Sequence, residues 1–191
     1  MQPGRRHRAG ILERSLETPP RQANLSSFSF MFSELVQYCR DRAGTLTDLE
    51  RKLEELGHRV GRRSIELCIY RDKPFRRETK VLGILSFIQT SVWKNLFGKP
   101  ADDIQKSVEN EGEYFLIDNL PLVNQFVSVP DDLGEFNCGA FLAGIVQGCL
   151  DGADFPAIVE THSVEGPAYP PRTFILIRFS AEVLEREKRF V

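Results

Sequence analysis

The sequence is poor in the side chains that hold metals or act as nucleophiles. Its three histidines lie far apart, at His7, His58 and His162. Its four cysteines are also scattered, within apolar patterns and with no C-x-x-C pair, at Cys39, Cys68, Cys138 and Cys149. Metal sites need ligands at short, recurring spacings. We therefore expect no metal site, and we expect four reduced, buried thiols.

The motifs of common enzymes are missing as well. The chain has no G-x-G-x-x-G, no G-x-x-x-x-G-K-[ST] and no G-x-S-x-G. Nucleotide cradles and serine hydrolases depend on these patterns. The acidic pairs Asp102-Asp103 and Asp131-Asp132 fit turns. We predict no catalytic residues, no cofactor and no enzyme activity.

Long apolar runs and a basic surplus are absent too. No stretch approaches the roughly 18 apolar residues of a membrane span, and no apolar signal segment opens the chain. The formal net charge of −2 offers no basic field for nucleic acid. These features predict a cytosolic protein with at most peripheral membrane association and no nucleic-acid partner.

The 191 residues, 41% of them hydrophobic, suffice for one globular domain. We assign residues 24–191 to this domain and residues 1–23 to a flexible basic arm of open function. Five arginines mark the arm, namely Arg5, Arg6, Arg8, Arg14 and Arg21.

The first half of the domain reads as helices. Ser26 or Ser27 can cap a helix from Phe28, and this helix is apolar on two sides, which suggests a partner. Thr45 to Asp48 resembles a capping box before a leucine stripe that should end at Gly57, with a third helix from His58 to Tyr70. The predicted partner interface comprises Phe28, Phe30, Met31, Phe32, Leu35, Leu46, Leu49 and Leu53.

A long helix is predicted from Arg76 to Gly98, with Leu82, Leu85, Gln89, Val92 and Leu96 on one face. We expect it to be the central helix of the fold, with another backbone passing close to Gly83.

In the second half of the sequence the apolar residues change from a helical to a strand-like spacing. Residues 101–112 read as a polar linker, Tyr114 to Ile117 as a strand, and Leu122 to Val129 as a second strand. Small residues between Phe136 and Leu150 predict a tightly packed helix. Strands at 155–161 and 173–179, a loop between them, and a helix at 181–190 complete an α+β fold.

Three stretches carry a family resemblance: R-R-E-T-K-V-L-G-I-L-S-F-I-Q-T-S-V-W-K-N-L-F-G-K, L-P-L-V-N-Q-F-V-S-V-P and F-N-C-G-A-F-L-A-G-I-V-Q-G-C-L. In this order they resemble the small-subunit family of the transport protein particle (TRAPP). The motif positions are Arg77, Glu78, Thr79, Gly83, Pro121, Leu122, Val123 and Pro130.

The resemblance implies an α/β plait, in which helices pack on a twisted antiparallel sheet. It implies a scaffold subunit that forms a heterodimer with another TRAPP small subunit, inside a complex that tethers vesicles between the endoplasmic reticulum and the Golgi. The complex acts as an exchange factor for Rab GTPases, which this subunit would meet only indirectly.

One alternative stays open, a module that binds an apolar ligand such as an acyl chain beside the helix at 76–98. A sister subunit carries an acylated cysteine where Lys73 stands here, so a covalent acyl chain at this position is not expected. The proline-rich loop at 164–171 has no assigned role.

Overall fold

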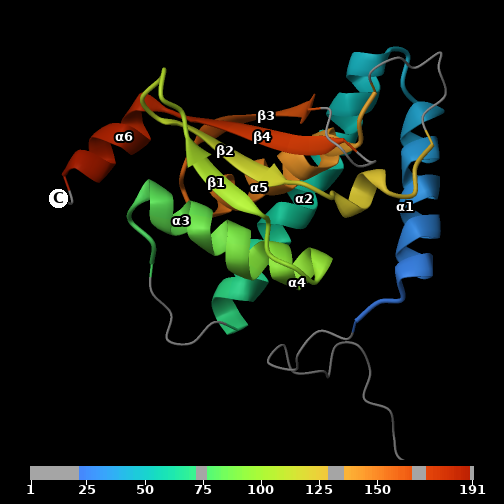
Figure 1. Cartoon of the computed structure of the whole chain (residues 1–191), viewed down its shortest axis with the longest axis horizontal. Helices are drawn as coiled ribbons and strands as arrows, with labels where there is room; N and C mark the ends of the chain where they lie inside the picture. The colour runs from blue at the N-terminus through green and yellow to red at the C-terminus, as the bar shows by residue number, and fades with distance from the viewer. Residues whose placement is uncertain (1–21, 72–76, 129–135, 165–170, 190–191) are drawn as a thin grey trace, which may run out of the picture.

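In the computed structural model, which describes residues 22–71, 77–128, 136–164 and 171–189, helices pack on a four-stranded antiparallel sheet (Figure 1). The helices are α1 (Leu25–Arg40), α2 (Leu46–Arg71), α3 (Val81–Phe87), α4 (Trp93–Phe97), α5 (Gly139–Gly152) and α6 (Ala181–Lys188). The strands are β1 (Asp103–Lys106), β2 (Glu113–Asp118), β3 (Ala157–Val164) and β4 (Arg172–Phe179), in the spatial order β1-β2-β4-β3. This arrangement confirms the predicted α+β class. Of the predicted basic arm, only residues 22 and 23 are described.

The starts of α1 and α2 follow local capping chemistry. The side chain of Asn24 accepts a hydrogen bond from the Ser26 amide at 2.9 Å, so the cap of α1 lies before the two serines that we predicted. At α2 the Asp48 amide donates to Thr45 Oγ1 at 3.2 Å, and the Gly44 amide donates to Asp48 Oδ2 at 3.4 Å. Thr45 therefore caps α2 as predicted, and the Asp48 carboxylate reaches back to Gly44 instead of to the amide of Thr45.

α2 does not end at Gly57, and the separate third helix is wrong, because one helix runs on to Arg71. Gly57 and Gly61 instead lie where α2 crosses α5. A Cβ atom at Gly57 would overlap the carbonyl oxygen of Phe141, and a Cβ atom at Gly144 would overlap that of Glu54. The small residues of α5 thus serve tight internal packing, as predicted, and α2 is the helix that they meet.

The helix predicted from Arg76 begins only at Val81 and ends, as predicted, at Gly98 with a φ of 79°. Its middle part, Ile88–Val92, is a π-helical turn, which shifts the phase of the side chains. After this turn Trp93 is fully buried, while Leu82, which lies before the turn and was predicted for the apolar face, is exposed. The side chain of Glu78, and not a second backbone, approaches Gly83.

The predicted role of this segment as the central helix is also wrong, since α5 has that place. Ten of the fourteen residues of α5 are buried, and the helix packs against both α2 and the sheet. Figure 1 shows α5 between the strands and α2.

Two predictions for the second half fail. Residues 103–106 form the short edge strand β1, which pairs with β2 from Asp103 opposite Ile117 to Lys106 opposite Tyr114. Leu122–Asn124 forms a 3₁₀ turn instead of a strand, and Val129 and the turn at Pro130 lie outside the described residues. The strand at Tyr114–Ile117 and the last two strands are confirmed.

All four cysteines are buried, as predicted, and none of them forms a disulfide within the described residues. Burial raises the pKa of the Cys138 thiol to about 12. Burial also raises the pKa of Cys149 and of Cys39, and for Cys39 the charges of Lys52 and Arg42 offset part of this effect. Because the thiolate is the reactive form, these groups are inert near neutral pH.

Alkylation tests this burial. In the folded protein at pH 8, iodoacetamide should modify the four cysteines far more slowly than a free thiol, because they are buried and those pKa values are raised. In urea all four should react quickly. Mass spectrometry after timed quenching gives both rates, and rapid labelling of one cysteine in the folded protein would contradict its buried position.

The helix crossing gives a second prediction. Gly144→Ala should lower the free energy of unfolding by about 2 kcal/mol or more, because the new methyl group meets the α2 backbone. An alanine would otherwise favour the helix by about 1 kcal/mol. Urea unfolding measures the change.

The matched control is Gly44→Ala, where no atom lies within 4 Å of the added Cβ. It should change the stability by less than about 0.5 kcal/mol. Equal stabilities of the two variants would contradict the close approach of α2 and α5.

Candidate interaction surface

α1 is held to the rest of the molecule by one face. Phe32, Val36 and Cys39 are buried on this face. The ring of Phe32 meets the ring of Phe141 on α5 edge to face, with the centroids 5.3 Å apart. Figure 1 shows α1 at the border of the molecule, so the opposite side of this helix faces away from the core.

The outer side of α1 carries apolar side chains that the described residues leave largely exposed. Phe30 is 76% exposed, Met31 62% and Tyr38 54%. Met31, Leu35 and Tyr38 follow one another at the spacing of a helical stripe, and Phe30 lies beside it. We call Phe30, Met31, Leu35 and Tyr38 the α1 face.

The composition of the α1 face is that of an interface core. Single exposed apolar residues are common on protein surfaces, but a contiguous group of them is informative. Aromatic residues and methionine are enriched where proteins bind one another. The guanidinium of Arg42 lies 3.6 Å from the centroid of the Tyr38 ring, which fixes that ring on the surface.

The eight residues predicted for the interface divide between surface and core. Phe32, Leu49 and Leu53 are buried inside the chain and have no surface to offer a partner. Phe28 and Leu35 are half-buried, and Phe30, Met31 and Leu46 are exposed. Tyr38 belongs to the surface but was missing from the predicted set, although its position seven residues after Met31 is a usable signal.

The family-motif residues lie partly in the core and partly on the surface. Arg77 lies 3.5 Å from Asp154 Oδ2, and Arg186 Nη1 donates to the same oxygen at 3.1 Å. This ties the segment before α3 to the turn after α5 and to α6. Pro121 and Val123 are buried, Leu122 is half-buried, Glu78 and Thr79 are exposed, and Pro130 lies outside the described residues.

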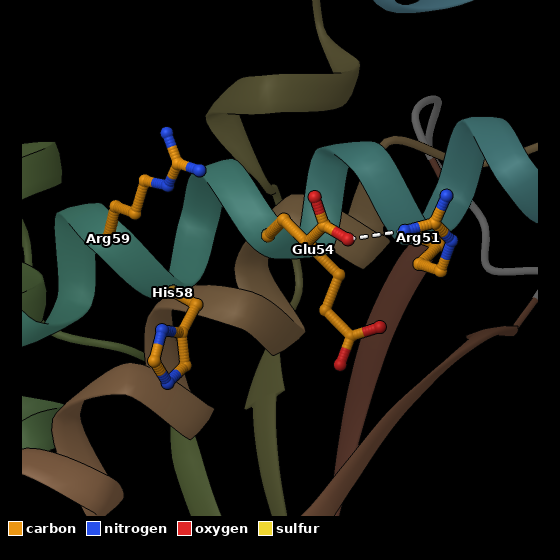
Figure 2. Close-up of a pocket in the computed structure, with 5 residues that line it drawn as sticks. Arg51, Glu54, His58 and Arg59 are labelled. Carbon is orange, nitrogen blue, oxygen red and sulfur yellow. Dashed lines mark hydrogen bonds and ion pairs between the residues drawn. The ribbon is translucent and has the colours of Figure 1, made fainter.

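A hollow of about 330 Å³ lies on α2 and is lined by Arg51, Glu54, Glu55, His58 and Arg59. Figure 2 shows that the labelled side chains all project from this one helix. Arg51 is ion-paired with Glu55, and His58 Nε2 lies 2.8 Å from Asp151 Oδ2 on α5. Desolvation, and then the charge of Glu55, raise the pKa of Glu54. Several of these charges already have partners, and the lining includes no nucleophile.

Other kinds of site find little support in the described residues. Within them, no three His, Cys, Asp or Glu side chains come together as a group able to hold a metal ion. Within the same residues, no helix combines the length and the apolar character that a bilayer crossing needs. Leu85, Ile88 and Trp93 are fully buried beneath α3 and its continuation, so an acyl chain there would have to displace them. Lys73 lies outside the described residues.

The relatives that are similar over nearly the whole chain are named as subunits of the trafficking protein particle complex. Trafficking protein particle complex subunit 5 of Dictyostelium discoideum is 51% identical over 178 residues, which are 92% of this chain and 95% of the relative. The human protein of the same name is 39% identical over 183 residues, or 96% of this chain and 94% of the relative. Subunit 31 of the complex in Saccharomyces cerevisiae is 28% identical over 239 aligned positions, which cover 93% of this chain and 83% of the relative.

A solved structure has the same fold. It is a trafficking protein particle complex subunit 3 from Naegleria fowleri, covalently bound to palmitic acid. The TM-score is 0.67 at 16% identity, over 82% of this chain and 95% of that chain. At this identity the likeness shows the fold alone.

The family model "Transport protein particle (TRAPP) component" matches residues 28–180, most of the described chain. This match agrees with the three motif stretches and with the relatives named subunit 5. The chain therefore belongs to the TRAPP component family.

Proposed function

We propose that the chain is a non-catalytic scaffold subunit of a TRAPP complex, held there by a sister small subunit that covers the α1 face. The exposed α1 face carries this proposal, because Phe30, Met31 and Tyr38 are each more than half exposed within the described chain. The names of the relatives, which are subunits of such a complex, support the assignment.

The energetics favour a stable partner. Covering a large apolar side chain contributes about 1.5–3 kcal/mol. Three such side chains, with half-buried Leu35 beside them, supply the central anchors of a heterodimer interface. Leu46, at the start of α2, offers a further exposed apolar contact.

The wider role follows from the complex. We propose that the assembled complex tethers vesicles in transport from the endoplasmic reticulum to the Golgi and promotes nucleotide exchange on a Rab GTPase. As a scaffold subunit, this chain meets the Rab only indirectly. Its place is the cytoplasm, with peripheral attachment to Golgi and endoplasmic reticulum membranes through the complex.

The test is co-purification with a sister TRAPP small subunit. Met31→Asp and Phe30→Asp should each weaken this heterodimer roughly 30-fold or more, because a charge replaces an apolar anchor in the covered interface. Both positions are exposed in the single chain, so the thermal midpoint of the isolated variants should stay the same. Calorimetry gives the affinities.

Val108→Asp is the matched control, since Val108 is fully exposed and lies between β1 and β2, away from α1. This variant should bind the sister subunit as the parent chain does. Unchanged affinity of both α1 variants would refute the α1 face as the heterodimer surface.

A further inference from the structure

Among the residues that the structure describes, the sheet has one protected edge and one open edge. The protected edge is β1, which is four residues long and presents Asp103, Gln105 and Lys106 to solvent. The open edge is β3, whose eight residues, Ala157–Val164, pair one to one with β4 in unbroken register. Natural edge strands are usually short, bulged, or marked by proline or lysine. β3 is eight residues long, pairs with β4 without a bulge and contains neither proline nor lysine, and Glu160 is its one acidic side chain.

The outer backbone of β3 has no partner in the described chain. Among the described residues, no backbone hydrogen bond outside the ladder with β4 reaches residues 157–164. In Figure 1 β3 forms the upper border of the sheet. An edge of this length is a ready template for another strand.

The outward side chains of β3 have a symmetric order. Ile158, Glu160, His162 and Val164 alternate with Val159, which belongs to the core. The two apolar members stand at the ends and are open to solvent, Ile158 to 62% and Val164 to 43%. Between them lie an acidic side chain and an imidazole.

We propose that the β3 edge binds the β3 edge of a second copy of this chain, antiparallel, about a two-fold axis at Thr161. In this register Ile158 lies opposite Val164 of the second copy, and Glu160 lies opposite His162 of the second copy. Each pair occurs twice by symmetry. The two sheets then form one continuous sheet of eight strands.

The charged and apolar side chains favour this register over the adjacent registers. Two residues that lie directly opposite each other in an antiparallel pair have their side chains on the same face of the sheet. The two-fold axis must therefore pass through a residue, and alternative registers differ by whole residues. An axis at Glu160 places that carboxylate opposite its own copy, which is unfavourable. An axis at His162 places Glu160 opposite Val164. The axis at Thr161 alone pairs apolar with apolar and acid with imidazole.

The groups around Glu160 allow the new contact. Arg178 Nη1 donates to Glu160 Oε2 at 2.9 Å, and Arg178 Nε donates to Glu113 Oε1 at 3.0 Å. These bonds hold the Glu160 carboxylate on the outer face and leave it acceptor sites. A neutral imidazole has one N–H to donate, so the contact with His162 needs no added proton.

Sedimentation velocity of the full-length chain over a range of concentrations tests the proposal. His162→Lys should tighten the dimer, and His162→Glu should weaken it, by roughly tenfold each, since every dimer contains the altered pair twice. His162 is exposed in the single chain, so both variants should keep the thermal midpoint of the parent.

Three results would overturn the β3 dimer. They are a chain that stays monomeric at all concentrations, a dimer insensitive to both His162 variants, and protection of β3 amides from hydrogen exchange by a sister subunit's strand instead of a second copy. Self-association through the α1 face would respond to Phe30→Asp and not to His162, so failure here is distinguishable from failure of the heterodimer surface.

Discussion

The approach of α2 to α5, backbone against backbone, is the constraint on which the other elements depend. Gly57, Gly61, Gly144 and Gly148 remove the side chains that would hold the helices apart, and carbonyl oxygens of each helix lie against the glycines of the other. In an interior packed this closely, any added side-chain volume displaces the neighbouring residues. α1 contacts α5 through Phe32 and Phe141, and the strands lie on the side of α5 turned away from α2. Widening the crossing would therefore displace the elements on both sides.

Sequence reasoning succeeded where one local interaction decides the structure. The hydroxyl of Thr45 starts α2, and the left-handed conformation of Gly98 ends α4, whatever the rest of the chain does. It failed where a residue type serves two purposes. A glycine such as Gly57 can end a helix or admit a neighbouring backbone, and only the position of α5 distinguishes the two. Likewise the π-helical turn at Ile88–Val92 changes the helical phase, which no fixed period of 3.6 can anticipate.

The candidate site shows the same limit. The sequence identified α1 as an interface helix because it is apolar on two sides, but it could not orient the helix. Phe30 and Phe32 are two residues apart, and one is exposed while the other contacts α5. In an ordinary amphipathic helix the polar side marks the solvent. Seven of the sixteen residues of α1 are polar, but four of these are serines, which mark the solvent side only weakly, so tertiary contacts decide which phenylalanine remains exposed. Leu49 and Leu53 lie on the apolar stripe of α2, and this stripe packs into the core of the chain itself.

The two open surfaces of the chain have different physical characters, and this difference suggests different lifetimes for their complexes. The α1 face offers large apolar side chains, whose burial gives a strong, non-directional gain. Such a surface suits a partner that stays bound, because its exposure invites aggregation. The β3 edge offers backbone hydrogen bonds and a single acid–imidazole pair in each half, which gain little net free energy in water but fix one register. A contact of that kind is reversible and selective, and it suits an association between assembled complexes more than the building of one.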